Sequence, residues 1–150
     1  MRSRELFSAL CVIATVLCGG MPAGAVTLVS QAEADLPASK EAPFNPRGVM
    51  RGPAIELLAP SDNAAKSPMI FHVKFRAHNG ATIDPASVTV VYLKAKPVDL
   101  TERVRPYVTA EGIDIKDAEV PPGTHLFRIF ARDSEGRGGT QTIKLSVTPR

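Results

Sequence analysis

Two consecutive alternating segments near the C-terminus constrain the fold of this chain more than any other feature of its sequence. Residues 123–133 alternate between polar and apolar side chains, begin at a Pro-Pro-Gly turn and end in an Asp-Ser-Glu-Gly turn. Residues 140–147 alternate in the same way and place on one side Ile143, Leu145 and Val147. A period of two predicts strands that bury one face, and the polar loop between these two predicts an antiparallel hairpin. The hairpin indicates a fold and not a reaction.

The first 25 residues have the order of a secretory signal peptide. Arg2 and Arg4 precede an apolar run over residues 6–17, and the small residues 23–25 (Ala-Gly-Ala) follow it. This order is typical of a cleaved signal, and the run is shorter than the about 20 residues that a membrane-spanning helix needs. We therefore expect cleavage after Ala25, export to the periplasm or beyond, and no membrane span.

Both cysteines of the chain, Cys11 and Cys18, lie within this predicted signal peptide. The expected mature chain therefore has no disulfide, no thiolate metal ligand and no cysteine nucleophile. Cys18 leaves a lipoprotein alternative open, which we disfavour because Leu17 stands where a small residue is normal. Removal of two arginines and one glutamate lowers the formal net charge of +3 by one. Nucleic-acid binding usually needs a concentrated basic surface, so we expect no such partner.

The expected mature chain divides into a linker and one domain. Residues 26–52 are rich in Ala and Pro and show no sustained period, so we expect a flexible, disordered linker. From residue 53 to residue 150, short alternating segments between turn residues predict about seven strands. The clearest of these are residues 69–77, with one apolar face, and residues 88–94, with apolar side chains on both faces. The predicted fold class is all-β, a single antiparallel sandwich.

Three stretches of the predicted domain resemble bacterial immunoglobulin-like domains of exported proteins. They are residues 55–64 (IELLAPSDNA), residues 83–88 (IDPASV), and residues 122–123 followed by 131–137 (ARDSEGR). The resemblance spans about residues 53–148 and implies a seven-stranded immunoglobulin-like sandwich. Such modules serve as spacers, adhesion units, carbohydrate-contacting appendages and subunits of envelope assemblies, so the resemblance implies no single function. The chain departs from antibody-type domains because it has no tryptophan and no cysteine pair in the domain.

The parity of the hairpin residues predicts a surface with an apolar centre and a basic edge. If Phe127 and Ile129 face inward, their neighbours in sequence face outward, and the third strand of an immunoglobulin-like order adds further apolar residues. Contiguous apolar patches often mark partner sites, and aromatic and arginine side chains are enriched at binding hot spots. The residues predicted to bind a partner are Val91, Leu93, Leu126, Arg128, Phe130 and Arg132. The alternative, that residues 97–107 fold over this surface and bury it, stays open at this point.

We therefore predict an exported, non-enzymatic interaction module with an envelope protein as partner. An alternative function is a periplasmic carrier of calcium, copper or another small ligand. Asp133 and Glu135 present two carboxylates beside a glycine, with Asp84 as a candidate third ligand for a hard cation. We favour the simpler explanation that Asp133 caps its own turn. The chain's three histidines are dispersed along the sequence at His72, His78 and His125. We expect no resident metal or cofactor.

Motifs for catalysis are absent from the sequence. It contains no Gly-x-Ser-x-Gly elbow, no His-Glu-x-x-His helix and no phosphate-binding glycine loop. Asp114, Asp117 and Glu119 form an acidic run, but a glycosidase would need two carboxylates that face each other across a cleft. A third possibility, a sugar-contacting appendage, is weakened because only Tyr92 and Tyr107 accompany the phenylalanines as aromatic residues. We predict that the chain is not an enzyme.

Overall fold

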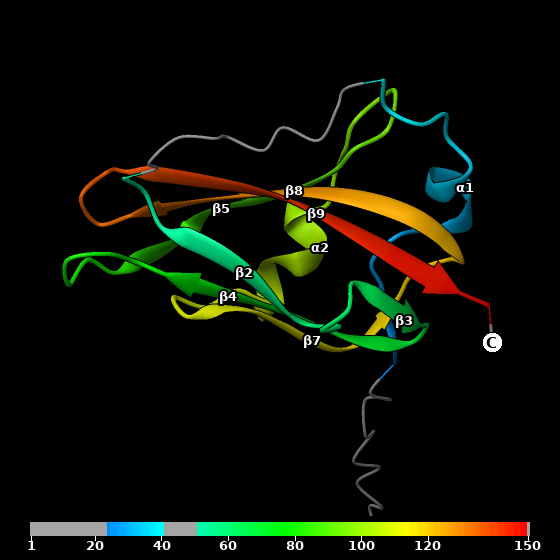
Figure 1. Ribbon diagram of the computed structural model, residues 1–150, viewed down its shortest axis with the longest axis horizontal. Helices are drawn as coiled ribbons and strands as arrows, with labels where there is room; N and C mark the ends of the chain where they lie inside the picture. Colours follow the sequence, from blue (N-terminus) through cyan, green and yellow to red (C-terminus); the bar gives the residue numbers. More distant parts are fainter. Residues whose placement is uncertain (1–23, 41–50, 150) are drawn as a thin grey trace, which may run out of the picture.

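The computed structural model describes residues 24–40 and 51–149, which form two stacked β-sheets (Figure 1). The four-stranded sheet contains, in spatial order, β1 (Val26–Thr27), β7 (Gly112–Glu119), β4 (Met69–Arg76) and β2 (Ala54–Ala59). The five-stranded sheet contains, in spatial order, β3 (Ala64–Lys66), β9 (Gly138–Thr148), β8 (Gly123–Asp133), β5 (Ile83–Tyr92) and β6 (Val98–Asp99). Three single-turn helices accompany the sheets: α1 (Gln31–Ala34), α2 (Thr101–Val104) and the 3₁₀ helix η1 (Arg105–Tyr107).

The predicted all-β sandwich is confirmed, but the described residues contain nine strands and not seven. Three of the nine strands, β1, β3 and β6, are only two or three residues long. Such strands are too short for an alternating pattern to develop, so periodicity cannot reveal them. Residues 1–23, which hold most of the predicted signal peptide, lie outside the described residues, and no helix among the described residues is long and apolar enough to cross a membrane.

The predicted hairpin is the longest strand pair of the structure. β8 and β9 pair antiparallel without a register shift from Gly123↔Val147 to Arg132↔Gly138. At the turn, the amide of Asp133 donates to the carbonyl of Arg137 at 3.0 Å, and Gly136 takes a positive φ of 77°. A glycine suits this position because a Cβ would be strained there. The turn therefore fixes the register that decides which side chains of β8 face outward.

The core lies between the two sheets and is filled by the inward-facing residues of the central strands. Phe71 of β4 and Phe127 of β8 meet across it with ring centroids 6.0 Å apart. Fully buried side chains on both sides include Val73, Ile113, Ile115, Tyr92, Ile129 and Leu145. Each buried side chain of this size contributes about 1.5–3 kcal/mol through removal of apolar surface from water. Hydrophobic packing alone therefore accounts for a stable domain without a disulfide in the described residues.

One side of the sandwich is closed where the chain passes from one sheet to the other. β2 pairs with β4 in the four-stranded sheet, whereas β3, which follows it, pairs with β9 in the five-stranded sheet. Before β2, the backbone at Gly52 lies against the backbone at Gly138, so that a Cβ on Gly52 would stand 2.0 Å from the Gly138 carbonyl oxygen. Only a residue without a side chain permits this approach.

The opposite side is closed by α2, which Figure 1 shows between the two sheets. Leu100 and Val104 have no exposed surface and belong to the core. The amide of Leu100 donates to the carbonyl of Val90 at 2.9 Å, which attaches the segment to β5. The suggestion that residues 97–107 cover the outer face of the hairpin sheet is therefore wrong. Their apolar residues enter the core instead, because the sheets leave this side open.

The segment that precedes the domain also packs against the sandwich. β1 pairs parallel with β7 in the register Val26↔Ala118, and Leu28 and Val29 are 0% and 1% exposed. Residues 26–40 of the predicted flexible linker (residues 26–52) instead form a strand, a helix and core contacts, and its residues 41–50 lie outside the described residues. We name residues 26–40 the strap. A single apolar pair without a period gave no sequence signal, and the prolines of the segment favoured the linker interpretation.

Candidate functional site

The outer face of the five-stranded sheet brings together most of the residues predicted to bind a partner. On β8, residues with even numbers point outward, because the intervening residues from His125 to Asp133 are buried. Val91 of β5 lies beside Arg128, which lies beside Thr142 of β9. Phe130 lies between Thr89 and Thr140 in the same way. We name six residues of this face the docking face: Val91, Leu126, Arg128, Phe130, Arg132 and Lys144.

The docking face combines apolar and cationic side chains. Val91, Leu126, Arg128 and Phe130 are half-buried, and Arg132 is exposed. The register places Lys144 directly beside Leu126. The result is a strip in which cations alternate with apolar side chains along β8. Such a strip suits a partner that offers apolar area together with carboxylates.

Phe130 is held in a defined position on this face. The guanidinium carbon of Arg132 lies 5.9 Å from the ring centroid of Phe130, within the range of a cation–π interaction. On β9, the ring lies over Gly138, where a Cβ would approach ring atom Cε2 to 2.7 Å. A larger residue at position 138 would therefore displace the ring. Glycine at this position lets the aromatic side chain lie down on the sheet.

Leu93, the remaining predicted residue of this surface, is not available for contact. Its parity matches that of Val91, as the sequence predicts, but it is only 5% exposed. Ser39 and Lys40 of the strap line the same cavity as Leu93. The strap follows the chain after β5 at this point, since Ala38 pairs antiparallel with Lys94 and the amide of Ala95 donates to the carbonyl of Pro37 at 2.8 Å. The strap thus reaches one end of the docking face.

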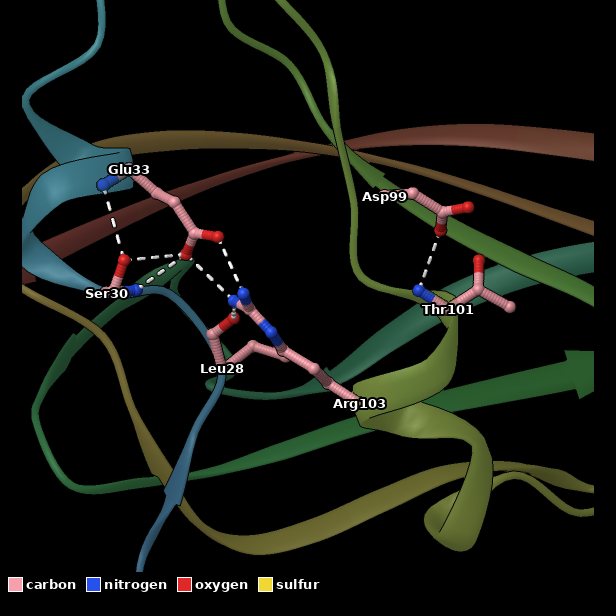
Figure 2. Close-up of polar contacts among 6 residues, drawn as sticks. All are labelled: Leu28, Ser30, Glu33, Asp99, Thr101 and Arg103. Carbon is pink, nitrogen blue, oxygen red and sulfur yellow. Dashed lines mark hydrogen bonds and ion pairs between the residues drawn. The ribbon is translucent and has the colours of Figure 1, made fainter.

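The strap is held to α2 by an ion pair that Figure 2 shows. Two guanidinium nitrogens of Arg103 donate to the two carboxylate oxygens of Glu33 at 2.7 and 2.8 Å. The same guanidinium donates to the carbonyl oxygen of Leu28 at 3.2 Å. The hydrogen bond from Arg103, together with those from Ser30, lowers the pKa of Glu33 to about 2 despite partial burial. Glu33 is therefore ionised at neutral pH.

Local hydrogen bonds place both partners of this ion pair. Ser30 and Glu33 form a capping box, in which the Ser30 hydroxyl accepts from the Glu33 amide and the Glu33 carboxylate accepts from the Ser30 amide. Before α2, the Asp99 carboxylate accepts from the Thr101 amide at 2.8 Å, as drawn in Figure 2. The hydrogen bonds from Thr101 hold the pKa of Asp99 below its ordinary value. Both α1 and α2 thus start at defined residues and direct Glu33 and Arg103 toward each other.

The candidate calcium ligands are engaged within the protein. The Asp133 carboxylate is buried and accepts from the amides of Glu135 and Arg137, at 3.0 and 2.9 Å, and from the Arg137 guanidinium at 2.8 Å. Burial would raise the pKa of Asp133, but the hydrogen bonds from Arg137 and Glu135 lower it overall. Glu135 also pairs with Arg137, and Asp84 accepts from the amide of Ala86. A calcium ion would have to displace the Arg137 guanidinium.

The three histidines lie in separate places. His72 is half-buried on β4, His78 is exposed in the turn after it, and His125 is buried in β8. Within residues 24–40 and 51–149, no group of three His, Cys, Asp or Glu side chains is placed to hold a metal ion.

His125 takes part in a buried hydrogen-bond chain that the sequence did not suggest. Its Nε2 donates to the carbonyl oxygen of Pro121 at 2.8 Å, so Nδ1 of the neutral ring accepts from the Tyr92 hydroxyl at 2.8 Å. Burial lowers the pKa of His125, and the nearby ammonium of Lys94 adds to this effect. Burial also raises the pKa of Tyr92 to about 12. The chain connects β5, β8 and the turn that precedes β8.

A groove of about 490 Å³ lies between the strap and the turn before β8. Polar groups on its wall already have partners, since the Thr27 hydroxyl donates to Glu119 at 3.4 Å and the Ser67 hydroxyl accepts from the Val120 amide at 3.0 Å. This groove therefore gives little support to a small-ligand site.

Comparison with known proteins adds little to this description. No protein-family model and no curated protein matches the chain. Among solved structures, the chain is similar to CopC from Methylosinus trichosporium OB3b, with 16% sequence identity and a TM-score of 0.40 over 58% of this chain and 83% of that one. A similarity at this level carries no conclusion about this chain. Membership of the immunoglobulin-like family stays a prediction.

Proposed function

We propose that this chain is an exported, non-enzymatic module that binds an acidic protein of the cell envelope through the docking face. The observation that carries the proposal is the strip on β8, where Leu126, Arg128, Phe130 and Arg132 point outward in a fixed register. The ring of Phe130 supplies apolar area, and the guanidinium groups on either side of it suit carboxylates of the partner.

The test replaces Phe130 and Arg128 together by alanine in the exported protein. Both side chains retain exposed surface, so the double variant is expected to keep nearly the melting temperature of the unchanged chain while copurification of the partner is lost. A matched control replaces Ile70 and Lys74, which are exposed on β4 in the other sheet, and should retain the partner. The complex should also weaken as salt is raised, since its charge contacts are screened.

Two results would contradict the proposal. A large drop in the melting temperature of the Phe130/Arg128 variant would assign these side chains to the core. Equal copurification with the Phe130/Arg128 variant and the Ile70/Lys74 variant would show that the partner binds elsewhere.

We favour this function over the calcium or copper carrier because of the contacts of Asp133. A carrier needs carboxylates or imidazoles that are open to the ion, whereas Asp133 and Glu135 both bind Arg137. Calorimetric titration of the protein with calcium and with copper separates the two functions. Heat with a thermal shift in either titration would support the carrier, and their absence at millimolar metal would remove it.

A further inference from the structure

The strap consists of two parts that are held in different ways. Residues 26–29 are an anchor, because β1 pairs with β7 and both Leu28 and Val29 are buried in the core. Residues 30–40, which we name the arm, contain no fully buried side chain. Segments with few buried apolar contacts open at a lower free energy than the domain as a whole. The arm is therefore the part of the strap that can leave the domain without unfolding it.

Polar contacts hold the arm in place, together with the partly buried Ala34, which packs against the core. Arg103 binds the Glu33 carboxylate with both of its terminal nitrogens, and the Lys94 ammonium donates to the Ala34 carbonyl oxygen at 2.7 Å. The Ala95 amide donates to the Pro37 carbonyl oxygen at 2.8 Å. The ion pair is the strongest of these contacts because it is bidentate and charged.

The far end of the arm pairs with the chain next to Leu93, an apolar residue that by its parity lies on the same side as the docking face. Leu93 follows Val91 on the same side of the chain, yet Leu93 is 5% exposed whereas Val91 is half-buried. Ser39 and Lys40 line the same cavity as Leu93, and Ala38 pairs with the adjacent Lys94. With the arm in place, the accessible apolar side chains of this face include Phe130 and Val91 but not Leu93.

We propose that the arm is an autoinhibitory contact, which must be released before a partner can use Leu93 together with the docking face. This inference rests on the proposed function and adds its regulation. A partner that contacts Leu93 binds the arm-released state only, so partner binding and arm release are coupled equilibria. Breaking the Glu33–Arg103 pair shifts the population toward the released state.

The experiment measures thiol accessibility and needs no partner. The chain is produced from Val26, which keeps all described strands and helices and contains no cysteine. A single cysteine is then introduced as Leu93→Cys or, as the matched control, as Val91→Cys. The labelling rate with N-ethylmaleimide is measured for each, with and without Glu33→Gln.

We expect Glu33→Gln to accelerate labelling of the Leu93→Cys protein by about tenfold, because loss of the charge-assisted contact makes local opening of the arm more frequent. Labelling of the Val91→Cys protein should not change. An unchanged rate at position 93, or an equal rise at both positions, would overturn the inference, because the arm would then not cover Leu93 or would not open by itself.

Because Leu93→Cys removes apolar volume, hydrogen exchange of the chain with its native Leu93 provides a second measurement. Glu33→Gln should speed exchange in residues 30–40 while β8 and β9 stay protected, and unchanged exchange in residues 30–40 would overturn the inference. Neither readout depends on copurification of a partner, so failure of the arm and failure of the docking face are distinguishable.

Discussion

Glu33 of the strap and Arg103 of α2 form a bidentate ion pair between residues 70 positions apart in sequence. The side chains are 17% and 39% exposed, so the pair is better shielded from water than a surface salt bridge. It joins the arm to the helix that closes the open side of the sandwich, and should therefore contribute to the stability of the fold.

We expect Glu33→Gln to lower the free energy of unfolding by about 1–2 kcal/mol at pH 7. Because the pKa of Glu33 is lowered to about 2 in the folded protein, the stabilisation is complete above its ordinary value of 4.5 and is lost as pH falls from there toward 2. Urea denaturation of both proteins between pH 7 and pH 2 should give curves that converge in acid.

The control for this prediction is Glu102→Gln. Glu102 pairs with Arg105 on the same turn, but its side chain is 83% exposed, so we expect a change below about 0.5 kcal/mol. If Glu102→Gln lowered the free energy of unfolding as much as Glu33→Gln does, the net charge of the helix, and not the contact with the strap, would explain the destabilisation.

Acid should destabilise the protein through His125. Burial holds the pKa of His125 below its ordinary value of about 6.5. As pH falls below 6.5, the unfolded chain therefore binds a proton at His125 before the folded chain does. The contribution of neutral His125 to the free energy of unfolding is therefore fully present above pH 6.5. It falls as pH drops below that value, by up to about 1.4 kcal/mol per pH unit.

Denaturation of the His125→Gln variant between pH 8 and pH 5 tests this account. Glutamine keeps a donor for the Pro121 carbonyl but does not titrate, so the slope should flatten relative to the unchanged protein. His78→Gln is the matched control, since it replaces an exposed histidine that lies outside the buried hydrogen-bond chain. Parallel slopes for the His125→Gln variant and the unchanged protein would contradict the assignment.

Truncation at the domain boundary expected from sequence should be costly. A chain that begins at Pro53 loses the buried side chains of Leu28 and Val29, and we expect its unfolding free energy to fall by about 3–5 kcal/mol relative to a chain that begins at Val26. Thermal denaturation of the two chains measures the difference. Equal melting temperatures would show that residues 26–40 act only as a linker.

The position of the Phe130 ring should depend on its neighbour Gly138. A methyl group at position 138 would meet the edge of the Phe130 ring, which can turn away, so Gly138→Ala should weaken partner binding more than it lowers stability. Gly80→Ala is the comparison without a packing contact: a Cβ there meets nothing within 4 Å, and its cost comes from the positive φ of 74°, so it should lower stability and leave partner binding unchanged. If Gly138→Ala left the affinity for the partner unchanged, Phe130 would not contact the partner.

The sequence predicted the elements in which side chains alternate over many residues. β4, β8 and β9 were found because one face of each is buried, and the same parity placed Arg128 and Phe130 on the outer face. Asp133 was expected to cap its own turn, and the structure shows that it does so with the help of Arg137.

The strap and the burial of Leu93 could not be read from the sequence. Leu28 and Val29 form an isolated pair, and a two-residue strand has no period to detect. Leu93 has the parity of an exposed residue, yet it is buried at the point where residues 37 and 38 pair with the chain after β5. Both features depend on pairings between distant segments, which composition and periodicity do not encode.

The central claim is that the docking face contacts an envelope protein. Its most direct test is photo-crosslinking in intact cells, with a photoreactive amino acid in place of Phe130 on the docking face or of Ile70 on the opposite sheet. We predict one crosslinked protein of acidic character from position 130, which disappears when Arg128 is also replaced, and none of the same mass from position 70. The same crosslink from both positions, or none from position 130, would contradict the account.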